Sequence, residues 1–258
     1  MNINYALTSQ TGARESNQDE TGALIGERCA CFLVCDGVAG TAGGETAARI
    51  ARDTLLAELM VDKPIQPADT AEWIDKAEQA IRQAQSKILN FDRMSTTLAA
   101  VFIDRDSQRA WWAHAGDSRI YHFRRGYIHA VTRDHSLAQQ LKDAGVDNSG
   151  INSNLLYNAL GAGGTLPVSY SEVMPLEDGD AFLVCTDGFW CSLTPEEMQQ
   201  ALRMVSSPHE WLALMQEAIN RSEQKDNLSA VAVWIGSPQE TTLLQSVADS
   251  GRFLPTRD

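Results

Sequence analysis

The strongest constraint in the sequence is a pair of similar apolar segments, each of which ends in an aspartate and a glycine. The segments are Phe32-Leu-Val-Cys-Asp-Gly37 and Phe182-Leu-Val-Cys-Thr-Asp-Gly188. A short apolar segment that stops at turn residues is typical of a buried β-strand. Because glycine permits a sharp backbone turn, each strand can present its aspartate at its C-terminal end. The sequence therefore predicts two buried strands that deliver Asp36 and Asp187.

Two further aspartates lie next to predicted strands. Asp226 precedes the apolar segment 228–235, and Asp117 lies in the turn Gly116-Asp-Ser118 between two strand-like segments. In an antiparallel sheet the start of one strand lies beside the end of its neighbour. We therefore expect one edge of a sheet to gather all four carboxylates.

Four neighbouring carboxylates would repel one another and raise their own pKa values unless a cation held them together. No histidine or cysteine accompanies the four acids at ligand spacing, which favours Mg²⁺ or Mn²⁺ over Zn²⁺. Spacing alone leaves a structural role open, because Asp-Gly is a common turn dipeptide and the chain has 34 acidic residues. Asp178-Gly179 is one such pair, and we expect it to be a turn only.

Composition narrows the class of protein. The chain has 258 residues, of which 43% are hydrophobic and 21% charged, as expected for one large globular domain. Its net charge of −13 makes nucleic acid a poor partner. The sequence contains no apolar segment of about 20 residues and no signal peptide, so we expect no membrane partner and a cytoplasmic location.

The five cysteines show no CxxC spacing, and we interpret them as buried free thiols. None of them has an arginine six positions later, which excludes a phosphatase of the Cys-x5-Arg type.

Hydrophobic periodicity and turn residues predict alternating β-rich and helical regions. Helices are expected at residues 44–60, 69–91, 137–144 and 208–222, and a further helix begins at the capping box Thr194-Pro-Glu-Glu197. Strands are expected at residues 30–35, 98–103, 110–115, 119–123, 127–131, 181–185 and 230–235. The four strands between residues 98 and 131 predict an antiparallel meander. Residues 145–154, rich in glycine, asparagine and serine, predict a surface insertion.

Nine short segments occur in a fixed order. They are Arg14-Glu-Ser-Asn-Gln-Asp19, Asp36-Gly-Val-Ala-Gly40, Gly44-Glu45, Met94-Ser-Thr-Thr97, Gly116-Asp-Ser-Arg119, Asp134-His-Ser136, Ala159-Leu-Gly161, Thr186-Asp-Gly188 and Asp226-Asn227. In this order they resemble the PPM family, the serine/threonine phosphatases of the protein phosphatase 2C (PP2C) type, from about Thr11 to Ile235. Each segment alone is weak, but together they are specific. The Asn-Gln-Asp form and the compact length resemble the bacterial branch of the family.

The resemblance implies an α+β fold, a four-layer α-β-β-α sandwich in which helices flank two antiparallel sheets. Residues 1–236 would form the PP2C-like phosphatase domain, residues 137–158 a flap-type insertion within it, and residues 237–258 a peripheral C-terminal tail. The site would hold two or three Mn²⁺ or Mg²⁺ ions at one end of the sandwich. Asp36 would bridge two ions, Gly37 would offer its carbonyl oxygen to one, and Asp187 and Asp226 would complete the other.

The resemblance gives three further residues a role. Asp117, together with Asp187, would match an additional metal position proposed for bacterial members, and Asp19 would lie near the metals through a water molecule. Arg14 would clamp the substrate phosphate, because a guanidinium fork matches two phosphate oxygens and stays charged. We interpret Asp134-His-Ser136 as structural, a turn held by hydrogen bonds from side chains to the backbone.

The implied reaction is the hydrolysis of phosphoserine and phosphothreonine in proteins. Two metal ions about 3.5–4 Å apart would share a water molecule, lower its pKa and aim it at phosphorus, without a covalent enzyme intermediate. The implied partners are a phosphorylated protein substrate and a cognate bacterial Ser/Thr kinase whose action the enzyme would reverse. We expect a monomer.

The sequence departs from the family pattern in three places. Val38 stands where many eukaryotic members carry a histidine thought to protonate the leaving oxygen, so the resemblance supplies no side-chain general acid. Ala39-Gly40 replaces a Gly-Gly pair, and Ser95 replaces a glycine. Two alternatives therefore stay open: a weakly active or inactive PP2C-fold regulator that binds phosphoproteins, and a hydrolase of small phosphate esters.

Overall fold

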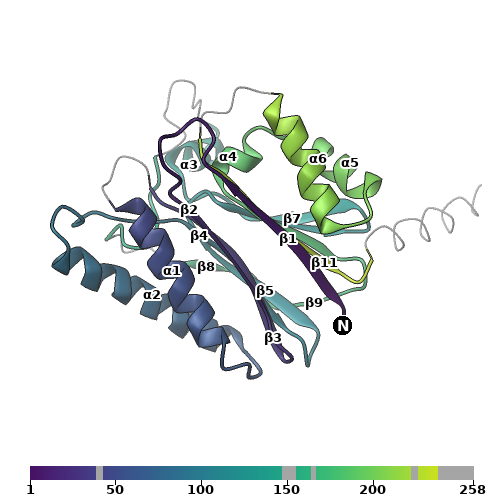
Figure 1. The fold of residues 1–258 in the computed structure, drawn as a ribbon, viewed down its shortest axis with the longest axis horizontal. Coiled ribbons are helices and arrows are strands. Elements are labelled where there is room, and N and C mark those ends of the chain that lie inside the picture. Colours follow the sequence, from purple (N-terminus) through teal and green to yellow (C-terminus); the bar gives the residue numbers. More distant parts are fainter. Residues whose placement is uncertain (39–42, 147–154, 164–166, 222–225, 238–258) are drawn as a thin grey trace, which may run out of the picture.

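Two antiparallel sheets pack face to face, and helices cover the outer face of each sheet (Figure 1). The computed structural model describes residues 1–38, 43–146, 155–163, 167–221 and 226–237. One sheet has five strands in the order β1-β11-β10-β6-β7, and the other has six, in which β2-β3-β4-β5-β8 are neighbours and β9 also pairs with β5. The predicted four-layer sandwich is confirmed.

The strands of the five-stranded sheet are β1 (Ile3–Gln10), β11 (Leu228–Ile235), β10 (Ala181–Cys185), β6 (Arg119–Arg124) and β7 (Tyr127–Val131). Those of the six-stranded sheet are β2 (Asp19–Ile25), β3 (Cys29–Asp36), β4 (Leu98–Asp104), β5 (Arg109–Ala115), β8 (Ser169–Tyr170) and β9 (Met174–Pro175). Phe32 and Val101 of one sheet and Phe182 and Val233 of the other belong to the buried layer between the sheets. Because helices cover the outer faces as well, central strands such as β3 and β11 read as continuous apolar runs.

The helices form two pairs. On the six-stranded sheet lie α1 (Gly44–Leu59) and α2 (Pro67–Lys87), and on the other sheet α5 (Pro195–Met204) and α6 (Pro208–Asn220). The short helices are α3 (Leu137–Asp143) and α4 (Asp187–Trp190). None of the helices in the described residues is long and apolar enough to cross a membrane.

The helix boundaries agree with the prediction except at α2. The capping box of α5 is present, since Thr194 Oγ1 accepts from the Glu197 amide and the Glu197 carboxylate accepts from the Thr194 amide. The second helix begins at Pro67 rather than residue 69 and ends at Lys87 rather than residue 91. Its start is fixed by Gln66, whose amide donates to the Asp69 carboxylate, a capping pair that the apolar stripe does not reveal.

The predicted meander between residues 98 and 131 was wrong. β4 pairs with β5 in the six-stranded sheet, whereas β6 pairs with β7 in the five-stranded sheet. The turn Gly116-Asp-Ser118 therefore carries the chain from one sheet to the other instead of closing a hairpin. A three-residue turn can close a hairpin or connect two sheets. The turn sequence therefore does not decide which sheet the next strand joins.

Strands β1 and β2 were not predicted, although the buried Ile3 between exposed neighbours shows the start of a strand alternation. Four cysteines are buried free thiols as expected, but Cys191 is exposed because it follows the short helix α4. Residues 147–154 of the predicted insertion and 238–258 of the predicted tail lie outside the described residues.

Candidate active site

The predicted acids meet at one end of the sandwich, but they come from both sheets rather than from one sheet edge. Asp36 ends β3, and Asp19 lies opposite it in register at the start of β2. Asp187 is the first residue of α4 directly after β10, Asp226 precedes β11, and Asp117 lies in the turn between the sheets. The acids Asp36, Asp117, Asp187 and Asp226 line a cleft of about 370 Å³ together with Arg14, Gly37 and Val38.

Asp36 is the electrostatic centre of this cleft. Withdrawal from water raises its pKa well above the ordinary range, and the charges of Asp19, Asp187, Asp117 and Asp226 raise it further. The position of Asp36 therefore favours either a proton or a bound cation.

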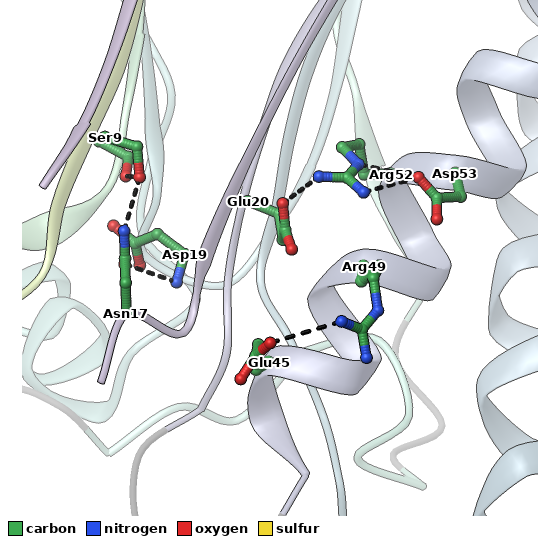
Figure 2. A network of polar contacts seen from close by, with 9 residues as sticks. Ser9, Asn17, Asp19, Glu20, Glu45, Arg49, Arg52 and Asp53 are labelled. Carbon is green, nitrogen blue, oxygen red and sulfur yellow. Dashed lines mark hydrogen bonds and ion pairs between the residues drawn. The ribbon is translucent and has the colours of Figure 1, made fainter. Parts of the chain in front are cut away.

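Asp19 is held by hydroxyl groups from the opposite sheet. Its Oδ2 accepts from Thr186 Oγ1 at 2.9 Å, and its backbone amide donates to Asn17 Oδ1 at 3.1 Å. Burial raises the pKa of Asp19 to about 6, although hydrogen bonds from Ser229 and Thr186 lower it. Figure 2 shows Asn17 between Ser9 and Asp19, while Glu20, the next residue of β2, turns to Arg52 of α1. The strand alternation thus points Asp19 toward Thr186 of the opposite sheet and Glu20 toward a half-buried ion pair with α1.

Asp117 and Asp187 face the same cleft from two different segments. Burial raises the pKa of Asp117 to about 7, and the charge of Asp187 adds to the shift. Burial also raises the pKa of Asp187, followed by the charge of Asp226. Each carboxylate thus disfavours the ionisation of its neighbours.

The backbone around the acids is fixed by close packing. Thr96 Oγ1 donates to the Asp36 carbonyl at 2.9 Å, and the Asp36 amide donates to Thr97 Oγ1 at 2.9 Å. Gly188 lies so close to β11 that a Cβ atom there would come within 2.0 Å of the Asn227 carbonyl oxygen. A side chain at this position would push Asp187 away from Asp226.

Arg14 reaches the cleft from the segment between β1 and β2. Its Nε and Nη2 donate to the two carboxylate oxygens of Asp226 at 2.9 and 2.6 Å. Asn227 anchors the same segment, because its Nδ2 donates to the carbonyls of Thr11 and Ser16 at 2.7 and 2.9 Å. The pKa of Arg14 is raised, first by the hydrogen bond to Asp226, so the guanidinium stays charged.

The donor set suits a hard divalent cation. All the side-chain candidates are carboxylates, and Asp19 Oδ1 and Asp187 Oδ1 are buried oxygens that accept no hydrogen bond from the described residues. Within the described residues no three such side chains already converge on one point at ligand distance. A cation held by these carboxylates would offset their mutual repulsion.

Asp134-His-Ser136 has the structural role that we predicted, with one difference. Ser136 Oγ caps α3 by accepting from the Gln139 amide at 3.2 Å, and His135 Nδ1 accepts from the Gly116 amide at 3.3 Å. Asp134 instead binds the side chain of Arg119 at 2.7 and 2.8 Å. This segment therefore braces the turn that carries Asp117.

Several residues of the site were quoted as motif members but given no role from the sequence. They are Thr96, Thr97, Thr186 and Asn227, which hold the acids or their backbone in place. A hydroxyl or amide that holds an acid in place has no distinctive spacing in the sequence. The contacts of these four residues depend on which strands become neighbours, so the sequence alone does not reveal them.

Comparison with known proteins gives consistent matches over nearly the whole chain. The family model described as "Protein phosphatase 2C" matches residues 8–232. The serine/threonine phosphatase stp of Listeria innocua is 26% identical over 255 residues, which cover 94% of this chain and 97% of the relative. The serine/threonine protein phosphatase PstP of Mycobacterium tuberculosis is 28% identical over 241 residues, covering 89% of this chain and 44% of the relative.

Solved structures agree with the fold. A crystal structure of the Mycobacterium tuberculosis serine/threonine phosphatase PstP/Ppp superposes with a TM-score of 0.77 at 25% identity, covering 91% of this chain and 99% of that one. A second structure, the catalytic domain of PstP in complex with two manganese ions, gives a TM-score of 0.77 at 26% identity and covers 91% and 98% of the two chains. The resemblance seen in the motifs is thereby confirmed, and the chain belongs to the protein phosphatase 2C family.

Proposed function

We propose that this protein hydrolyses phosphoserine and phosphothreonine in proteins with the help of Mn²⁺ or Mg²⁺. The observation that carries the proposal is the meeting of Asp36, Asp117, Asp187 and Asp226 in one cleft beside Arg14. Membership of the protein phosphatase 2C family and the manganese complex of PstP support the metal requirement. When bound, such ions lower the pKa of water and polarise phosphoryl oxygens.

We assign the residues that hold the ions as follows. Asp36 lies centrally enough to bridge two ions, and the Gly37 carbonyl would complete the coordination of one of them. Asp187 and Asp226 would bind the other, with Asp117 and Asp187 sharing an outer ion. Asp19, held by Thr186, would orient water near Asp36.

Arg14 would bind the phosphoryl group of the substrate. Its guanidinium fork already fits a carboxylate in a two-point contact with Asp226, and a phosphate presents the same geometry. Cation binding by Asp226 would free the fork for the substrate. Val38 lines the cleft without a titratable group, so proton transfer to the leaving oxygen would fall to water.

The substrate would be a protein phosphorylated by a Ser/Thr kinase. The relatives stp and PstP are named as serine/threonine phosphatases, and this chain covers 97% of the length of the Listeria protein. We therefore infer that the enzyme reverses a kinase of the same cell.

The test compares phosphate release from a phosphothreonine peptide and from p-nitrophenyl phosphate. We expect activity with Mn²⁺ or Mg²⁺, its loss on chelation, and its collapse by about 10³-fold or more in Asp36→Asn, because the central ligand is removed. Asp178→Asn changes the other Asp-Gly turn and serves as the matched control, which should keep full activity.

The two substrates separate the proposal from its alternatives. A metal-loaded wild type without turnover on either substrate would support a phosphoprotein-binding regulator instead. Equal kcat/KM on the peptide and the small ester would support a hydrolase of small phosphate esters.

A further inference from the structure

Trp190, the last residue of α4, makes two contacts with the turn that carries Asp117. Its indole Nε1 donates to the Asp117 backbone carbonyl at 2.9 Å. Its ring lies against the Arg119 guanidinium, whose central carbon is 3.3 Å from the ring centroid. Trp190 therefore contacts the connection between the two sheets at two points, the Asp117 carbonyl and the Arg119 guanidinium.

The guanidinium under the ring is itself fixed. Arg119 Nε and Nη2 donate to the two Asp134 oxygens at 2.7 and 2.8 Å, and Nη1 donates to the Tyr121 hydroxyl at 3.1 Å. An arginine that uses its fork in this way has little rotational freedom left. The ring of Trp190 thus packs against a guanidinium whose orientation is fixed by its own hydrogen bonds.

Trp190 joins the two segments that carry neighbouring acids. Asp187 begins α4, and Trp190 ends it one turn later, with the Trp190 amide bonded to the Thr186 carbonyl at 3.2 Å. The indole bond then reaches the backbone of Asp117. Any movement of α4 relative to the turn would change the separation of the Asp117 and Asp187 carboxylates.

Phe189 and Trp190 play different parts in the packing of α4. Phe189 is fully buried and anchors α4 in the core, whereas Trp190 is half-buried and lines a groove that adjoins the cleft at Asp117 and Asp187. The indole hydrogen bond of Trp190 thus links the wall of this groove to the backbone of the turn that carries Asp117.

We propose that Trp190 is a positioning residue that sets the distance between Asp117 and Asp187 and thereby the affinity of the outer cation shared by them. The proposal rests on the metal sites of the proposed function. It concerns cation binding before any substrate is present, so it can be tested without turnover.

The experiment measures Mn²⁺ binding to the whole chain by calorimetry in the absence of substrate. Trp190→Phe keeps a ring over Arg119 but removes the indole N–H, and we expect the weakest Mn²⁺ affinity to fall about 3- to 10-fold, as for the loss of one hydrogen bond. Trp211→Phe is the matched control, because the Trp211 indole also donates to a backbone carbonyl, that of Met198 at 3.2 Å, between α5 and α6. This control should bind Mn²⁺ like the wild type.

A double-mutant cycle with Asp117→Asn gives the second readout. If Trp190 acts through Asp117, Trp190→Phe should weaken Mn²⁺ binding no further when Asp117→Asn is already present. Enzyme activity should then recover in Trp190→Phe at saturating Mn²⁺, with a higher Mn²⁺ concentration at half-activation.

Three outcomes would overturn the proposal: wild-type Mn²⁺ affinity in Trp190→Phe, an equal loss in Trp211→Phe, or additive losses in the double variant. A protein that binds Mn²⁺ but hydrolyses neither phosphopeptide nor small ester would instead refute the proposed function. In that case the binding data still decide the role of Trp190.

Discussion

Buried carboxylates at the cleft carry an electrostatic cost that a proton or a cation relieves. Asp117 illustrates it, since burial and the charge of Asp187 raise its pKa to about 7. At neutral pH without metal, the acid is close to half-protonated in the folded chain. Cation binding should therefore release protons and weaken as the pH falls below about 7.

The same shift makes the stability of the metal-free protein depend on pH. Because the folded pKa of Asp117 lies above its unfolded value of about 3.9, its contribution is fully present below about pH 4 and is lost as the pH rises through about 7. In a chelator, wild type should therefore lose stability relative to Asp117→Asn between pH 5 and pH 8, on the order of a few kcal/mol. Urea unfolding of both proteins at each pH measures the difference.

The comparison with Asp117→Asn also removes an opposing effect. Burial, and then the charge of His114, lower the pKa of His135 to about 4, so the stability due to neutral His135 is present above about pH 6.5 and is lost as the pH falls toward 4. Wild type and Asp117→Asn both contain His135, so its effect on stability cancels when the two proteins are compared. A stability difference that stays constant from pH 5 to pH 8 would contradict the assigned shift of Asp117.

Arg14 gives a second prediction at the scale of one residue. Arg14→Ala should lower kcat/KM on a phosphopeptide about 10- to 100-fold, because charged hydrogen bonds to phosphate are lost, while Arg14→Lys should keep part of the activity as a single-point cation. Mn²⁺ affinity should not fall, since the change frees Asp226 from its ion pair.

A suitable control for Arg14 is Arg28→Ala. Arg28 also pairs with a carboxylate on an exposed surface away from the cleft, since its Nε and Nη2 both donate to Asp106 Oδ2, at 2.9 and 2.8 Å. Steady-state kinetics with both variants tests the assignment. Loss of activity together with loss of Mn²⁺ binding in Arg14→Ala would point to a role in holding the site together instead of binding phosphate.

At the scale of elements, helix starts are the features that local sequence determines best. Thr194 and Glu197 predicted the start of α5 because a capping box needs only residues three apart. Strand β1 was missed because it pairs only with β11, more than 200 residues later. Its local pattern is mixed, since exposed Tyr5 and Leu7 occupy an edge strand.

The capping box of α5 supports a prediction about stability. Thr194→Ala removes the oxygen that accepts from the Glu197 amide, and we expect a loss of about 1 kcal/mol in the free energy of unfolding. Denaturant unfolding measures it. Phosphatase activity at 25 °C should stay unchanged, because α5 lies on the outer face of the five-stranded sheet; a fall in kcat would contradict this separation of helix and site.

At the scale of the whole molecule, the sequence predicted the acids better than their arrangement. Asp36 and Asp187 could be identified because each follows an apolar segment and precedes a glycine. The roles of Asp117, Asp226 and Arg14 came from the family resemblance. Their distribution over two sheets was not predicted, because the turn at Gly116-Asp-Ser118 gives no local sign that it crosses between sheets. The roles of the residues that hold the acids in place could not be predicted for the same reason. Thr186 contacts Asp19 only because the end of β10 in one sheet lies beside the start of β2 in the other.

The pairing of β1 with β11 along eight residues makes the two ends of the described fold neighbours. During synthesis on a ribosome, β1 leaves the exit tunnel long before its partner strand has been translated. Arg14 and Asp226, which meet in the cleft, are separated by the same delay. The nascent chain therefore passes through most of its translation without phosphatase activity, and any product that stops before Asp226 lacks that carboxylate and leaves β1 without its partner strand.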